Sequence, residues 1–147
     1  MEFLMTYGWA ILVVLAAIGA LAYFGILSPD KFLPSSCTVS GGFSCGEFKV
    51  NTTHARFVIM NNLGVDATSV AVNLTPTTSG CVVDGGVVGA TGLGNGEKIN
   101  GGLLSFPYSG CTLSVGDKFK GNIKVTYVKS GETLSHEATG TLQTKVE

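Results

Sequence analysis

The chain begins with a long apolar segment, which predicts one helix that must be covered on all sides. Residues 3–27 include no charged side chain, and residues 9–27 are apolar throughout. A helix of this length spans roughly 37 Å, which is enough for the hydrocarbon core of a bilayer. Because apolar side chains occur all round it, lipid or other helices must enclose it completely. Pro29 follows, so we expect a helix over residues 1–28 and a linker over residues 29–36.

Beyond the linker the pattern changes to short segments in which apolar and polar residues alternate. Between residues 119 and 128 the odd positions are mostly apolar, and polar residues, among them lysines, take most of the even ones. This alternation is typical of a half-buried strand, and residues 129–132 fit a hairpin turn into a final strand. Strands at this spacing predict an α+β chain whose head, residues 37–147, is an immunoglobulin-like β-sandwich. The predicted strands cover residues 47–50, 55–61, 68–74, 81–83, 87–90, 98–104, 112–115, 119–128 and 133–145.

The four cysteines, Cys37, Cys45, Cys81 and Cys111, all lie in the predicted head. None belongs to a closely spaced pair of the kind that binds zinc, so we expect no metal site. An even number of cysteines behind an apolar segment favours two disulfides formed outside the cytoplasm, with four buried free thiols as the alternative. Of the three possible connectivities we favour Cys37–Cys45 with Cys81–Cys111, because local pairing closes the shortest loops.

Three explanations of the apolar helix compete. A cleaved secretory signal would begin with basic residues, whereas this chain begins Met-Glu-Phe. In an ordinary membrane anchor, Lys31 as the first basic residue would place the head in the cytoplasm by the positive-inside rule. The cysteines, and the glycosylation sequons at Asn51 and Asn73, instead argue for a head outside the cell. A short basic leader, removed after insertion, would resolve this contradiction because its charge would set the orientation.

Residues 2–14, with the sequence EFLMTYGWAILVV, resemble the mature N-terminus of archaeal type IV pilins that carry a class III signal peptide. The β-rich remainder with its cysteine pairs is more loosely similar to the head domains of this group. The resemblance implies that a prepilin peptidase removes a leader, that membrane assembly machinery handles the subunit, and that the helices polymerise into a filament core. The glutamate of the family near the mature N-terminus maps onto Glu2. The residues expected to take part in assembly are Glu2, Phe3, Leu4, Tyr7, Trp9, Ile11, Leu12, Leu15, Ile18, Leu21, Tyr23 and Phe24.

Catalytic patterns are missing from the sequence. His54 and His136 are accompanied by no GxSxG, HExxH or paired-carboxylate arrangement, so we expect both on the surface at strand ends. The glycine-rich residues 91–96 lack the GK[ST] ending of a phosphate loop and are expected to form a flexible loop. The net charge of −1 gives no reason to expect nucleic acid as a partner. No cofactor and no enzymatic activity are expected.

The sequence therefore predicts a structural subunit of an extracellular filament on the cell surface, an adhesive pilin. Its main partners would be copies of itself, and N-linked glycans at Asn51 and Asn73 would shield the filament. One alternative is a single-pass membrane protein with an extracellular binding domain. A second is a subunit of the archaellum, the motility filament, whose helix is built similarly. A third, a secreted enzyme behind a signal anchor, lacks the catalytic residues it would need.

Overall fold

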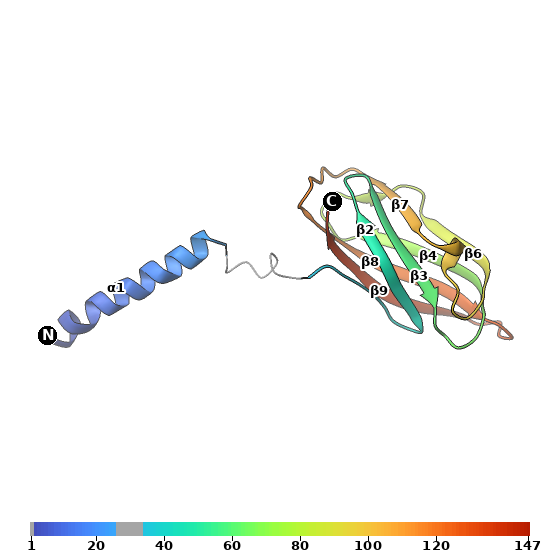
Figure 1. Ribbon diagram of the computed structural model, residues 1–147, viewed down its shortest axis with the longest axis horizontal. Helices are drawn as coiled ribbons and strands as arrows, with labels where there is room; N and C mark the ends of the chain where they lie inside the picture. The colour runs from blue at the N-terminus through green and yellow to red at the C-terminus, as the bar shows by residue number, and fades with distance from the viewer. Residues whose placement is uncertain (1, 26–33) are drawn as a thin grey trace. The chain divides into compact units, whose positions relative to one another are not determined.

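The computed structural model describes residues 2–25 and 34–147, and the chain divides into two compact units, Met1–Pro34 and Ser35–Glu147. The first unit contains one helix, α1, over Glu2–Tyr23 (Figure 1). The helix ends before the predicted boundary at residue 28, because Gly25 adopts a left-handed φ of 68° and its N–H bonds to the carbonyl of Ala22, three residues back. Residues 26–28 of the predicted helix and residues 29–33 of the predicted linker lie outside the described residues.

The second unit is a sandwich of two antiparallel sheets (Figure 1). The five-stranded sheet has the order β1-β9-β8-β4-β6, and the four-stranded sheet has the order β2-β3-β7-β5. Together with α1, this confirms an α+β chain with an apolar N-terminal helix and an all-β sandwich head. The strands are β1 Ser36–Val39, β2 Phe43–Val50, β3 His54–Asn61, β4 Ala67–Pro76, β5 Val82–Val83, β6 Val87–Leu93, β7 Leu104–Ser109, β8 Lys118–Lys129 and β9 Ser135–Lys145.

Several strand predictions were wrong. The predicted strand over residues 98–104 is replaced by a short 3₁₀ turn, η2 (Ile99–Gly101), in which Asn100 has a left-handed φ of 51°. The strand itself follows as β7. It was not predicted, because Pro107 lies within it and proline is uncommon inside strands. Residues 112–115 form no strand; the N–H of Ser114 instead bonds to the Asp117 carboxylate at 2.8 Å. Strand β1 was not predicted, and residues 91–93 of the predicted flexible loop belong to β6.

The inner faces of the two sheets form one hydrophobic core. In β8, alternate residues from Phe119 to Tyr127 are buried, as the period of two predicts. Phe57 of β3 stacks on Phe106 of β7 with ring centroids 5.1 Å apart, and Tyr108 stacks on Phe119 at 5.3 Å. Such aromatic pairs add about 0.5–1.5 kcal/mol each beyond the area that they bury.

The hairpin of β8 and β9 is the longest strand pair of the head, with a continuous register from Lys118↔Lys145 to Val128↔Ser135. The predicted turn is confirmed. The N–H of Glu132 bonds to the carbonyl of Lys129 at 3.0 Å, and Gly131 supplies the left-handed φ of 87° that the turn needs.

Candidate functional site

The apolar helix α1 presents a large hydrophobic surface to solvent. None of its residues is buried, and the side chains of Phe3, Trp9 and Leu15 remain 77%, 67% and 64% exposed. Soluble monomers rarely leave a contiguous apolar patch of this size in water. By length and composition α1 is also able to cross a membrane. A helix surface of this kind is typically covered by lipid or by protein.

The residues predicted for assembly all lie in the described part of the chain. Each apolar one is exposed: Phe3, Leu4, Tyr7, Trp9, Ile11, Leu12, Leu15, Ile18, Leu21, Tyr23 and Phe24. The structure adds Met5, Val13 and Val14, which are equally exposed and which the sequence reasoning did not single out. A Cβ added at Gly8 or Gly19 would meet no atom of the chain within 4 Å. These two glycines therefore leave gaps in the helix surface that a second helix can approach closely.

Glu2 is the first residue of α1, exposed and close to the positive end of the helix dipole. The helix contains no basic residue, and no described residue forms an ion pair with Glu2. The nearby Thr6 hydroxyl donates to the backbone carbonyl of Glu2 at 2.9 Å, and no described residue donates a hydrogen bond to the Glu2 carboxylate. A cation that pairs with this carboxylate must come from outside the described chain.

Both favoured disulfides are present, and all four cysteines are paired. Cys37 lies in β1 and Cys45 in β2, with their Cα atoms 5.6 Å apart, so this bridge ties the edges of the two sheets together. It does so where the chain enters the head. The second bridge differs, because it lies within one sheet: Cys81 and Cys111, with Cα atoms 4.7 Å apart, lie just beyond the paired residues Val82 of β5 and Ser109 of β7.

The sequon at Asn51 lies in a tight turn between β2 and β3. Its side-chain oxygen accepts hydrogen bonds from the backbone N–H groups of Thr53 at 3.0 Å and of His54 at 2.7 Å. Tyr108 donates its hydroxyl proton to the Asn51 backbone carbonyl, and burial raises the pKa of this phenol. No described residue accepts a hydrogen bond from Asn51 Nδ2, the atom that would carry a glycan.

The sequon at Asn73 has a different setting. Asn73 lies within β4, opposite Lys124 of β8 on one side and Val87 of β6 on the other. Its chain neighbours Val72 and Leu74 point into the core and are fully buried, so Asn73 lies on the outer face of the five-stranded sheet. It is half-buried there.

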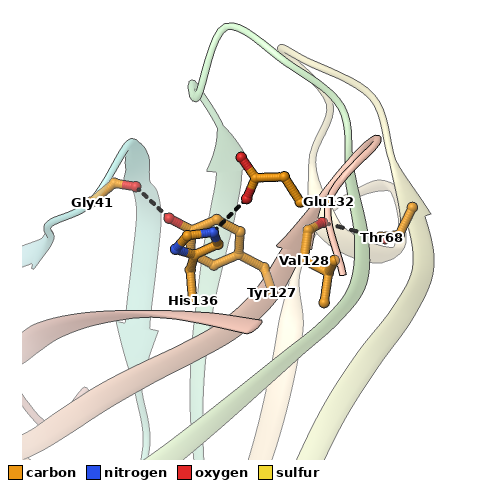
Figure 2. A network of polar contacts seen from close by, with 6 residues as sticks. All are labelled: Gly41, Thr68, Tyr127, Val128, Glu132 and His136. Carbon is orange, nitrogen blue, oxygen red and sulfur yellow. Dashed lines mark hydrogen bonds and ion pairs between the residues drawn. The ribbon is translucent and has the colours of Figure 1, made fainter. Parts of the chain in front are cut away.

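His136 takes part in a small polar cluster at the β8–β9 end of the head (Figure 2). Its Nε2 lies 2.7 Å from the Glu132 carboxylate, and its ring stacks on Tyr127 with centroids 5.5 Å apart. His136 and Lys129, in that order of importance, lower the pKa of Glu132. His54 Nδ1 lies 2.7 Å from the hydroxyl of the preceding residue, Thr53, and no carboxylate of the described residues forms an ion pair with this histidine. Both histidines lie at strand ends, as predicted.

The described residues hold no group of three or more His, Cys, Asp or Glu side chains arranged to bind a metal ion. A groove of about 600 Å³ on the outer face of the five-stranded sheet is lined by threonine, serine, asparagine and lysine. It brings together no acid and base suited to catalysis.

Comparison with other proteins identifies no relative: no protein-family model matches the chain, and neither does any curated protein. What the chain does must therefore be inferred from the exposed helix and the disulfide-bonded head.

Proposed function

We propose that this chain is the structural subunit of an extracellular filament of the archaeal type IV pilin class. In this proposal a membrane peptidase and assembly machinery deliver the subunit, its apolar helix joins the filament core, and the head contacts surfaces outside. Glycans at Asn51 and Asn73 would decorate the head; both side chains are half-buried, and no described residue accepts a hydrogen bond from either Nδ2.

The observation that supports this proposal is the exposure of the apolar side chains of α1, none of whose residues is buried. Full burial of one Leu, Ile or Val side chain contributes about 1.5–3 kcal/mol. More than ten large apolar side chains of the helix are exposed, so their burial against neighbouring helices supplies tens of kcal/mol before entropy is subtracted. Head-to-tail contacts that do not close into a ring turn such helix packing into a helical filament.

The head suits a subunit under mechanical load. The Cys37–Cys45 bridge fixes β1 to the opposite sheet, close to the point where the helix-bearing segment enters the sandwich. Thr144 of β9 adds a hydrogen bond from its hydroxyl to that of Ser35 at 3.2 Å. Force passed from the helix to the head would therefore reach both sheets at once.

A second candidate function is a membrane-anchored binding domain, because α1 is equally able to cross a membrane. Cell fractionation separates the two. Cells are sheared, the sheared material is pelleted, and the chain is identified by mass spectrometry together with its N-terminal peptide. We expect the chain as the dominant protein of sheared filaments, beginning near Glu2 with the apolar helix intact. Recovery in the membrane fraction alone, as a monomer after detergent extraction, would support the anchor instead.

A further inference from the structure

The free edges of the two sheets differ in how they are protected against pairing with another strand. The edge strands are β1 and β6 in one sheet and β2 and β5 in the other. β1 and β5 have four and two residues. β2 is longer, but its register shifts between Cys45 and Phe48, and it carries the charges of Glu47 and Lys49. Short length, bulges and charges are the features by which proteins block an open edge.

Strand β6 has none of these features. It has seven residues, VVGATGL, with no charge and no proline. It keeps one register with β4 from Val87 to Leu93. Among the described residues β4 is its only partner strand, and no further hydrogen bond reaches residues 87–92. One side of the β6 backbone is therefore open.

A groove lies beside this open edge. Its volume is about 720 Å³, and it is lined on one side by β6 residues 89–93 and on the other by Glu97, Lys98, Asn100 and Gly101. The side chain of Val87 is 56% exposed, and Val88 and Ala90 are half-buried. Apolar atoms at the edge thus remain in contact with water, and covering them would be favourable.

We propose that β6 pairs with β6 of a second copy of this chain in antiparallel orientation, so that two five-stranded sheets join into one. Within the described head β6 is the single unblocked edge. A contact between the open edges of two copies is therefore a contact between their β6 strands. The strand carries no charge, so self-pairing places no like charges opposite each other. Its small residues, Gly89, Ala90 and Gly92, leave room for the partner strand.

A two-fold contact uses the same surface in both copies. Subunits within one helical filament all have the same polarity, so this contact cannot join neighbours of one filament. It joins heads of two filaments that run in opposite directions and so produces lateral bundles. This consequence rests on the proposed function, whereas the pairing itself depends on the head alone.

The test places a charge on the open edge. Thr91, exposed in β6, is changed to lysine (Thr91→Lys), and Val87→Lys provides a second edge variant. Thr133→Lys makes the same change at an exposed residue of the β8–β9 turn, away from the edge. Sheared filaments are imaged by electron microscopy. We expect both edge variants to form filaments and to lower the bundled fraction about tenfold, with Thr133→Lys matching the unmodified chain.

Unbundled filaments of the unmodified chain, or bundles that survive both edge variants, would overturn the inference. If cells make no filament of this chain, the proposed function fails and the pairing is still measurable. The full chain in detergent is then examined by analytical ultracentrifugation, with circular dichroism to check folding. A concentration-dependent dimer that Thr91→Lys or Val87→Lys abolishes supports β6 pairing, and a monomer at every concentration refutes it.

Discussion

The side-chain amide of Asn61 donates a hydrogen bond to the backbone carbonyl of Leu93, with 3.2 Å between nitrogen and oxygen. Asn61 ends β3 in one sheet, Leu93 ends β6 in the other, and Asn61 is fully buried. The same nitrogen also lies 3.0 Å from the carbonyl of Val65 and 3.3 Å from that of Gly94, while Oδ1 accepts the N–H of Leu63 at 2.9 Å. One buried side chain thus ties both sheets and two loops together.

Asn61→Ala should destabilise the head by about 2–4 kcal/mol, because the buried carbonyl of Leu93 and three part-buried backbone groups lose their bonds to this side chain. The measurement is guanidinium unfolding of the detergent-solubilised chain, followed by circular dichroism. Asn62→Ala is the matched control: Asn62 is exposed and donates one hydrogen bond to the Ser44 hydroxyl, so we expect a loss of about 0.5 kcal/mol or less. Equal losses in the two variants would show that Asn61 does not tie the sheets together.

The two disulfides should differ in their contribution to stability. The bridges are separated by 8 residues for Cys37–Cys45 and by 30 for Cys81–Cys111. Loop-closure entropy then gives about 2.5 kcal/mol for the first and about 3.5–4 kcal/mol for the second. Both cysteines of one bridge are replaced by serine, one bridge at a time. The same unfolding measurement then shows which bridge contributes more to stability. A larger loss for the shorter loop would contradict this entropic account.

Local patterns in the sequence predicted the helix, the sandwich and the disulfide pairing. The helix follows from an uninterrupted apolar segment, and β8 follows from alternation that its neighbours do not disturb. Strand β7 alternates just as regularly, with Leu104, Phe106 and Tyr108 buried. It was not predicted, because a proline within a segment usually argues against a strand there, and β7 contains Pro107.

Features that depend on strand order could not be predicted. The Asn61–Leu93 contact joins residues 32 positions apart, and no local pattern identifies such a pair. The open edge of β6 likewise exists because β4 lies between β6 and β8. The apolar residues of α1 were identifiable from the uninterrupted apolar segment, whereas the settings of Asn51 and Asn73 required the fold.

The contact between Glu132 and His136 makes a pH-dependent contribution to the stability of the head. The hydrogen bond from His136, followed by the charge of Lys129, holds the pKa of Glu132 below its ordinary value. Because the folded pKa is lowered, the contribution is complete above the unfolded pKa and is lost as the pH falls through the folded pKa. His136→Phe keeps a ring beside Tyr127 and removes the hydrogen bond, so we expect the pKa of Glu132 to rise. NMR titration of the Glu132 carboxyl measures this, and an unchanged pKa would mean that His136 is not the cause.

Glu2→Gln separates assembly from membrane insertion. The substitution removes a charge without adding one, so the helix should insert as before. If Glu2 pairs with a cation of a neighbouring subunit in the apolar core, the substitution leaves that cation unpaired, and filament yield should fall at least about tenfold. Quantified shearing of cells gives the yield, and Glu47→Gln, an exposed carboxylate of the head, is the control. A normal filament yield with Glu2→Gln would show that this carboxylate interacts only with the helix dipole and has no role in assembly.

The most direct test of the central claim is a cryo-electron microscopy reconstruction of filaments sheared from cells that express this chain. The account predicts a core of packed α1 helices, with Phe3, Trp9 and Leu15 buried between subunits and the β-sandwich heads on the outside. Filaments that lack this chain, or a core built from anything other than α1, would contradict it.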